Sequence, residues 1–248
     1  MIKLERGECP KELTKELIEE LMNIYKLDKG KDVWNSPKIK KPLKDALTNM
    51  SNNKCAYCEC MLNIETKDVT IDHFSPKVSN EILVLEWTNL LPSCLRCNRT
   101  KNSNEVEIIN PCEIDPKIHL GIKNNGFRLK EINNSIIGKN TIRVLRLNDI
   151  DRVVTARMII TEKIIEKLNE VLEDIEDTDI IKSKYINRIE GYLSEALRDR
   201  PYCAVASAKI LDDRGFKTLK LLCEEKGKWN DRLQKIENEL IILALPIE

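Results

Sequence analysis

The chain has 248 residues, and its 41 Lys and Arg residues balance 41 Asp and Glu residues, so the formal net charge is zero. This balance excludes a protein that holds nucleic acid through a general basic excess, because neutralised phosphates supply most of the non-specific affinity. An enzyme of this composition that acts on nucleic acid would need a local basic patch or a partner that delivers the substrate.

The remaining composition describes a folded chain outside the membrane. With 42% hydrophobic and 33% charged residues, a packed core can form and extensive disorder is excluded. No apolar run approaches the roughly 18 residues that span a bilayer, and no apolar stretch typical of a secretory signal follows Met1. Nine cysteines, an odd number, argue against a disulfide framework in a chain without an export signal. We therefore expect a cytoplasmic protein.

Residues 11–50 are expected to be helical, because Leu13, Leu17 and Leu21 recur at helical spacing. Pro37 and Pro42 interrupt this region, and a second helix is expected over residues 41–50. Four lysines form a basic cluster there, which is either a solvated face or a contact for phosphates. These are Lys38, Lys40, Lys41 and Lys44.

The next part of the chain changes character before the helical pattern returns. Residues 51–104 contain two cysteine pairs and a β-like run at 69–71. A turn signal at 124–126, before residues 127–129, predicts a small hairpin farther along the chain. Helices are then expected over 153–175, 180–198, 204–211 and 217–245, the last one interrupted near Gly227. The sequence thus predicts a mainly α protein in three parts: an N-terminal helical segment (1–50), a small metal-stapled core (51–135) and a helical C-terminal domain (136–248) that docks a partner.

Two C-x2-C pairs bracket part of the cysteine-rich stretch, and they are Cys55 with Cys58 and Cys94 with Cys97. Each pair can place two thiolates at adjacent corners of a tetrahedron around zinc, with Zn–S bonds of ~2.3 Å. Such a structural Zn²⁺ contributes folding free energy that a small core lacks. The alternatives are buried free thiols or a redox pair.

The other five cysteines are not expected to be ligands. Cys60 lies two residues beyond the first pair; it could replace a ligand, although a small buried side chain is the preferred interpretation. We interpret the isolated cysteines as packing residues, and they are Cys9, Cys112, Cys203 and Cys223.

Between the cysteine pairs, Asp72 and His73 stand side by side, and Asn89 and Asn98 follow. A neutral imidazole suits the deprotonation of water near neutral pH. A carboxylate is a hard oxygen ligand of the kind that holds Mg²⁺ or Mn²⁺ for phosphodiester hydrolysis. The imidazole also needs a partner that orients it, such as an Asn or a backbone carbonyl. Each residue alone has an ordinary structural interpretation, so the prediction depends on their occurring together and in this order.

This arrangement resembles the HNH, or His-Me finger, nucleases, whose ββα-metal core is a hairpin followed by a helix. The resemblance implies that His73 is the general base, Asp72 a metal ligand, and Asn89 the residue that orients His73. It also implies that Asn98 belongs to the site of the catalytic divalent ion, with Asn102 a weaker candidate one helical turn later. Many relatives have Glu where this chain has Asp72, which puts the geometry in doubt more than the function.

Further motifs resemble one HNH subfamily, the PtuB effectors of Septu anti-phage systems and their retron-associated relatives. They are Cys9-Pro10, the segment Lys54 to Glu59, and Asn110-Pro111 and Asp115-Pro116 followed by His119. The resemblance implies a PtuA-like ATPase partner of the ATP-binding-cassette type, and His119 is expected to be a structural residue near the site.

The reaction expected from this resemblance is hydrolysis of phosphodiester bonds in DNA. An RNase that acts on tRNA, or a zinc-binding adaptor with a dead hydrolytic site, are the alternatives. Trp87 is expected in the core. Arg96, Arg99 and Lys101, on or beside the predicted helix of the motif, either touch phosphates or form a solvated face.

Overall fold

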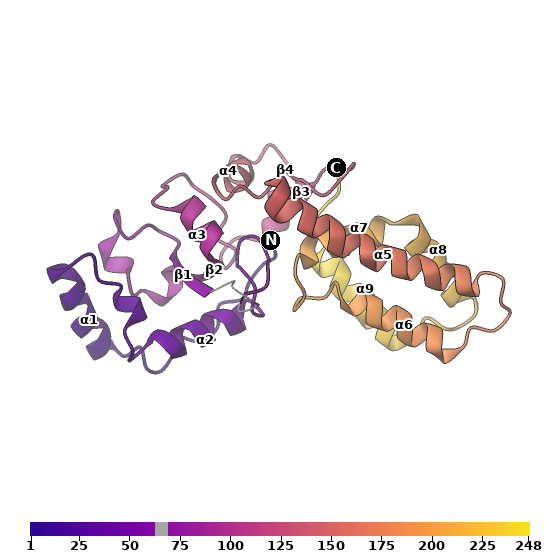
Figure 1. The fold of residues 1–248 in the computed structure, drawn as a ribbon, viewed down its shortest axis with the longest axis horizontal. Helices are drawn as coiled ribbons and strands as arrows, with labels where there is room; N and C mark the ends of the chain where they lie inside the picture. Colours follow the sequence, from indigo (N-terminus) through magenta and orange to yellow (C-terminus); the bar gives the residue numbers. More distant parts are fainter. Residues whose placement is uncertain (63–68) are drawn as a thin grey trace.

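A computed structural model describes residues 1–62 and 69–248 of the chain. Its elements form two lobes that lie side by side (Figure 1). The N-terminal half makes one lobe, which contains both small strand pairs, and helices α5 to α9 make the other. The expectation of a mainly helical protein with a small ββα core is confirmed. The division into three parts at residues 50 and 135 stays a prediction.

The N-terminal helices α1 (Lys15–Leu27) and α2 (Lys40–Met50) form where helical spacing predicted them. Thr14 caps α1, because its hydroxyl accepts a hydrogen bond from the backbone N–H of Leu17. Pro42 lies within the first turn of α2, where its missing N–H removes no helical hydrogen bond. Between them, the 3-10 turn η1 (Val33–Asn35) buries Trp34. These elements pack in one core with residues of the central strands.

The motif region folds as two antiparallel strands followed by a short helix. Strand β1 (Val69–His73) pairs with β2 (Leu90–Cys94), so that His73 lies opposite Leu90 and Val69 opposite Cys94. Helix α3 (Leu95–Lys101) follows β2 directly and packs against both strands. The loop between the strands contains the 3-10 turns η2 (Glu81–Leu83) and η3 (Trp87–Asn89). Trp87 is buried, as predicted.

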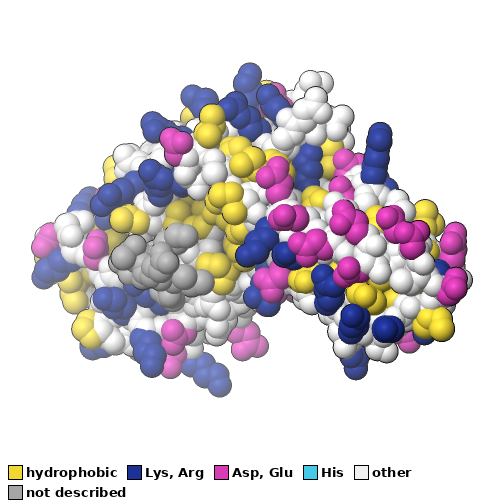
Figure 2. Space-filling view, turned by 45° about the vertical axis from the view of Figure 1, so that its right-hand side comes forward, with side chains coloured by type: hydrophobic (Ala, Val, Ile, Leu, Met, Phe, Trp, Pro, Cys, Tyr) yellow, Lys and Arg dark blue, Asp and Glu magenta, His cyan; other side chains and the backbone are white. Residues whose placement is uncertain are grey.

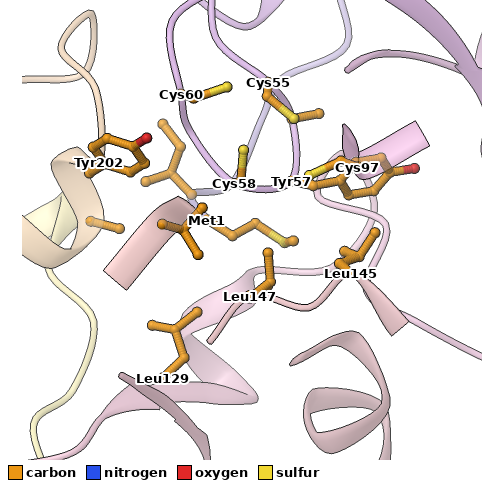
Figure 3. Close-up of a cluster of buried hydrophobic side chains, with 14 of the residues drawn as sticks. Met1, Cys55, Tyr57, Cys58, Cys60, Cys97, Leu129, Leu145, Leu147 and Tyr202 are labelled. Carbon is orange, nitrogen blue, oxygen red and sulfur yellow. The ribbon is translucent and has the colours of Figure 1, made fainter. Parts of the chain in front are cut away.

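A second strand pair packs in the hydrophobic core that contains the cysteine pairs. Strands β3 (Leu120–Ile122) and β4 (Leu129–Glu131) are antiparallel, which confirms the predicted hairpin. The turn η4 (Pro116–Ile118) precedes them and α4 (Ile136–Val144) follows. Apolar side chains of these elements share one core with the cysteine pairs. Figure 3 shows Leu147 near Cys58 and Leu145 near Cys97, with Leu129 farther from the cysteines. The metal-ligand candidates therefore lie inside a hydrophobic core.

The C-terminal lobe is a bundle with its own core. A π-helical turn, η5 (Ile150–Val154), leads into the long helix α5 (Thr155–Ile175). Helices α6 (Ser183–Ser194), α7 (Cys203–Asp212), α8 (Arg214–Glu225) and α9 (Asp231–Leu243) follow. The predicted break is confirmed between α8 and α9, where Gly227 has a φ of 63° that a side chain rarely adopts. Periodic apolar residues thus located each of these helices.

The two lobes share packing at their junction. The start of α7 supplies Tyr202 and Cys203 to the core around the cysteine pairs, and Figure 3 shows Tyr202 facing that cluster. The C-terminal segment returns to the N-terminal lobe, where Ile247 forms a parallel bridge with Ile122. Lys54 of the N-terminal lobe donates to the backbone carbonyl of Arg200 at 3.1 Å. The cysteine cluster therefore lies close to the boundary between the lobes.

Candidate active site and metal centre

The four paired cysteines meet in one place. The Sγ atoms of Cys55, Cys58, Cys94 and Cys97 all lie within 4.8 Å of one another, and all four residues are buried. The Cys58 and Cys94 sulfurs are 3.8 Å apart, close to the ~3.8 Å that tetrahedral geometry with ~2.3 Å Zn–S bonds requires. Cys94 caps α3, because its sulfur accepts from the Cys97 backbone N–H at 3.4 Å. The donor set and its spacing fit a structural zinc ion.

The surroundings of the cluster also favour a bound cation. Burial raises the pKa of the Cys55 thiol well above its ordinary value. Deprotonation of the four buried cysteines therefore requires a positive charge nearby. Arg152 supplies one such charge, since its guanidinium donates to the Cys97 sulfur at 3.5 Å. The same guanidinium donates to the carbonyl of Leu145 at 3.0 Å. Arg152 therefore joins the metal centre to the turn that precedes α5.

The other cysteines differ in burial. Cys60 is buried beside the cluster (Figure 3), as the preferred interpretation expected, and is not one of the four closely grouped sulfurs. Cys203 and Cys223 are buried, as predicted. The prediction was wrong for Cys9, which is exposed because it lies in the irregular segment before α1. Cys112 is half-buried, and its sulfur contacts that of Met50 at 3.9 Å.

His73 ends β1, and its ring is almost enclosed. The imidazole Nε2 lies 3.0 Å from the carbonyl oxygen of Val84. A carbonyl only accepts, so Nε2 carries the proton and Nδ1 keeps a free lone pair. Trp34 meets the ring edge to face, with 4.5 Å between the centroids. Burial lowers the pKa of His73 to about 4, and the charges of Lys77 and Lys101 add to this lowering. The imidazole is therefore neutral at physiological pH.

Asp72 is buried with two partners that the sequence did not indicate. The Tyr57 hydroxyl donates to Oδ2 of its carboxylate, and the Lys101 ammonium lies 3.3 Å from Oδ1. Burial raises the pKa of the carboxyl, and both partners oppose that rise. Lys101 also donates to the His73 carbonyl at 2.6 Å. The expectation that Lys101 meets phosphates or solvent was wrong, because its side chain is only 1% exposed.

Asn89 is buried, but its partners differ from the expected one. Its Oδ1 accepts from the Ser75 backbone N–H at 2.7 Å. Its Nδ2 donates to the carbonyls of Ser75 and Leu83, each at 3.1 Å. The amide thus fixes the two ends of the loop that carries His73 at one side and Val84 at the other. The direct partner of the imidazole is the Val84 carbonyl, and Asn89 acts on His73 only through the loop.

Asp72 and His73 open onto a cleft of about 260 Å³ between the loop after β1 and helix α3. Asn98 and Asn102 line the same cleft, so the structure brings together the predicted catalytic residues of β1 with both predicted amides. Asn98 donates from Nδ2 to the Thr70 hydroxyl at 3.1 Å, which leaves its Oδ1 available as a hard oxygen donor. The residues described around this cleft fit a divalent ion held by few protein ligands, as Mg²⁺ often is.

The rim of the cleft is basic, although the whole chain is neutral. Lys77 and Arg99 line it from opposite sides, and Lys77 lies 4.3 Å from the Trp34 ring centroid. Figure 2 shows Lys and Arg side chains spread over the left-hand lobe and acidic side chains gathered on the upper part of the right-hand lobe. His119 is separate from the cleft: its Nδ1 contacts the Ser135 hydroxyl at 2.8 Å, where Ser135 caps α4.

Sequence reasoning could have found part of what it missed. Lys101 follows Asn98 by three residues, a spacing that places both on one side of a helix. Tyr57 stands inside the first C-x2-C pair, so the grouping of the four cysteines holds it near the motif. Trp34 and Val84 gave no such signal, because their contacts with His73 depend on how distant segments pack.

Comparison with known proteins agrees with this geometry. The HNH endonuclease family model matches residues 55–104, the span that contains both cysteine pairs and the cleft. Over 246 residues, 95% of this chain and 92% of the relative, the chain is 37% identical to the Septu protein PtuB of Bacillus thuringiensis. The chain belongs to the Septu PtuB family. Another Septu protein PtuB, from Bacillus mycoides (strain KBAB4), is 34% identical over 140 residues, 43% of this chain and 46% of that protein. No solved structure matches the chain significantly.

Membership in the PtuB family, together with the HNH match, makes this chain a nuclease. Its four-cysteine cluster fits zinc binding, as predicted. Among the helices of the described residues, none is both long and apolar enough to cross a membrane.

Proposed function

We propose that this PtuB-family nuclease hydrolyses phosphodiester bonds of DNA with His73 as general base and with Mg²⁺ or Mn²⁺ held by Asp72 and Asn98. Asn102 is a weaker candidate for the same ion. One observation carries the proposal. A neutral imidazole, whose Nδ1 has no partner among the described residues, lines the same cleft as a carboxylate and an amide oxygen.

Each side chain has a task that follows from its contacts. His73 takes a proton from water at Nδ1, and the Val84 carbonyl fixes the ring while it does so. Asn89 keeps the loop rigid, so the base and the cleft hold their spacing. Lys77 and Arg99 attract the phosphate to the rim. The divalent ion, when bound, takes up negative charge on the phosphate and the leaving oxygen.

We further propose that a PtuA-like ATPase presents the substrate, as part of an anti-phage Septu defence complex. The zero net charge supports this, because Lys77 and Arg99 are the two cations among the described residues that line the cleft, and two cations alone bind phosphates weakly. The relatives are named as Septu proteins. The isolated chain is therefore expected to degrade plasmid slowly at physiological salt, and rapid unaided degradation would refute the dependence on a partner.

The test uses the two histidines of the chain. Wild type, His73→Ala and His119→Ala are each incubated with the proposed PtuA-like ATPase, on plasmid and on total tRNA, with Mg²⁺ or Mn²⁺. His119→Ala is the matched control, because His119 contacts Ser135 away from the cleft. We expect wild type and His119→Ala to cut plasmid and His73→Ala to lose at least about 100-fold in rate. Equal cutting by all three would refute the mechanism.

The same experiment decides between the alternatives. Cutting of tRNA but not of plasmid, lost in His73→Ala, would change the substrate to RNA and keep the mechanism. Binding of nucleic acid without cutting by any variant would support an adaptor with a dead site.

A further inference from the structure

A second hollow adjoins the catalytic cleft. It measures about 390 Å³ and lies between the loop after β1 and the segment that follows α3. Pro76 lines both hollows, so they are neighbours on one surface. Phe74, the residue directly after His73, also lines the second hollow. We call it the side pocket. Any group bound in it lies close to a phosphate that occupies the cleft.

The walls of the side pocket are of two kinds. Phe74, Pro76 and Ile108 give it an apolar wall that includes an aromatic ring. A ring of this kind can stack on a nucleobase, and such stacking is worth ~1–3 kcal/mol per base. Because every base has an apolar face, the wall alone would not distinguish one base from another.

Other residues that line the side pocket carry polar groups with unused hydrogen-bonding capacity. Asn80 donates from Nδ2 to the Ser75 hydroxyl at 2.6 Å, so its carbonyl oxygen remains an acceptor. Asn104 accepts from the Val106 N–H at 2.9 Å through Oδ1, so its amino group remains a donor. Glu105 uses one carboxylate oxygen for the Ser79 hydroxyl. Among the described residues, its other oxygen has no hydrogen-bond partner.

The charge of the side pocket is opposite to that of the cleft. Glu105 and Glu107 line the side pocket, whereas Lys77 and Arg99 line the cleft. A phosphate is therefore attracted to the cleft and repelled from the pocket beside it. The part of a nucleotide that suits an acidic, partly aromatic pocket is an uncharged base. A carboxylate accepts hydrogen bonds from exocyclic amino groups, which adenine, cytosine and guanine present and thymine lacks.

From this arrangement we propose that the side pocket binds an unpaired nucleobase next to the scissile phosphate, with a preference for a base that carries an exocyclic amino group (adenine, cytosine or guanine) over thymine. Phe74 stacks on the base, and Glu105 accepts from its amino group. A base inside a duplex cannot reach such a pocket, so the substrate presents a single-stranded or extruded nucleotide at the cut. This inference rests on the proposed function, because the cleft must hold the phosphate.

Binding tests the pocket without cutting. The full chain carrying His73→Ala is titrated with fluorescein-labelled deoxyadenosine hexamers in which a single abasic site is placed at each position in turn. We expect one position to lose about 5- to 150-fold in affinity when its base is missing. Phe74→Leu, which keeps an apolar side chain but no ring, should remove that position dependence. Zinc content and melting temperature show whether the variant is folded.

Base preference is tested on the same hexamers with each of the four bases at the sensitive position. Glu105→Gln should reduce the preference for the three amino-bearing bases over thymine by about tenfold. Glu162→Gln removes the same charge from the exposed face of α5 and should leave the preference unchanged. The absence of binding, equal losses at all positions, or a preference that survives both Phe74→Leu and Glu105→Gln would overturn the proposal.

The two proposals fail in different ways. Cutting by the wild type without any dependence on the flanking base would refute the side pocket and leave the nuclease mechanism. Base-dependent binding without cutting by the wild type would refute the hydrolysis and leave the side pocket.

Discussion

Replacing Lys101 with Met tests how the buried charges under the cleft are held. The Lys101 side chain is 1% exposed, and it donates to the His73 carbonyl at 2.6 Å and to Asp72 Oδ1 at 3.3 Å. Methionine keeps most of the apolar stem, so the variant leaves little cavity and mainly removes the ammonium. Asp72 then has only the Tyr57 hydroxyl as a partner. Breaking a buried pair in this way typically costs ~3–5 kcal/mol.

The pKa of Asp72 limits this cost. The carboxyl can avoid an unpaired charge by taking up a proton. At pH 7 this requires about 4 kcal/mol, because about three pH units separate pH 7 from the usual pKa of Asp and each unit is worth about 1.4 kcal/mol. A native carboxyl with a raised pKa keeps a proton that the unfolded chain releases, so the cost grows as pH rises above about 4. We expect Lys101→Met to lower the free energy of unfolding by about 3–4 kcal/mol at pH 7 and by less than about 2 kcal/mol at pH 5.

Urea unfolding with zinc present and no added magnesium measures this loss. Asp72→Asn and the double variant complete a cycle, in which we expect a coupling free energy of about 2–3 kcal/mol. Lys139→Met, at an exposed lysine of α4, is the control and should change stability by less than about 0.5 kcal/mol. A loss below about 1 kcal/mol at pH 7, or a loss that does not depend on pH, would show that Lys101 and Asp72 do not form a buried charge pair.

Three other predictions concern the four-cysteine cluster, His73 and the loop between β1 and β2. Cys58→Ser should release zinc to a chromogenic chelator and lower the melting temperature, whereas Cys223→Ser, at a buried cysteine outside the cluster, should retain zinc. The pKa of His73 in the folded protein is about 4, so the unfolded chain takes up a proton at this imidazole first as pH falls below about 6.5. The free energy of unfolding of the wild type should therefore fall by about 2–3 kcal/mol by pH 4. Urea unfolding at several pH values should show that His73→Gln lacks this loss. Parallel curves of unfolding free energy against pH for wild type and variant would contradict the prediction. Asn89→Ala should cost about 1–3 kcal/mol by denaturation and slow cutting about tenfold or more with zinc retained; an unchanged unfolding midpoint would show that the amide does not hold the loop.

The sequence was sufficient for the features that depend on local pattern. The helices of the C-terminal lobe follow from apolar spacing, and the four clustered cysteines follow from two C-x2-C motifs. The break at Gly227 follows from the conformational freedom of glycine. These signals lie within a few residues of one another, so no knowledge of the tertiary fold is needed to recognise them.

Other features depend on contacts between distant segments. The spacing of Lys101 from Asn98 places both on one side of α3, but the contact of Lys101 with Asp72 depends on how α3 packs against β1. Asn89 was expected at the imidazole, but the loop between β1 and β2 folds so that Ser75 and Leu83 reach its amide first. The ring of Trp34 reaches His73 from nearly 40 residues away in the sequence. The sequence therefore identified the residues of the site better than the contacts that these residues make.

The way the chain crosses between the lobes has a consequence for protein engineering. Asn124 donates to the Glu248 carbonyl at 3.0 Å, Lys54 to the Arg200 carbonyl at 3.1 Å, and Arg152 to Cys97 at 3.5 Å. Severing the chain after α4 would remove one partner from each of these contacts and uncover the core beside the four clustered cysteines. The catalytic half is thus a poor candidate for transplantation into a fusion protein. Tags or targeting modules are better attached to the exposed turns of the C-terminal bundle, away from the boundary between the lobes.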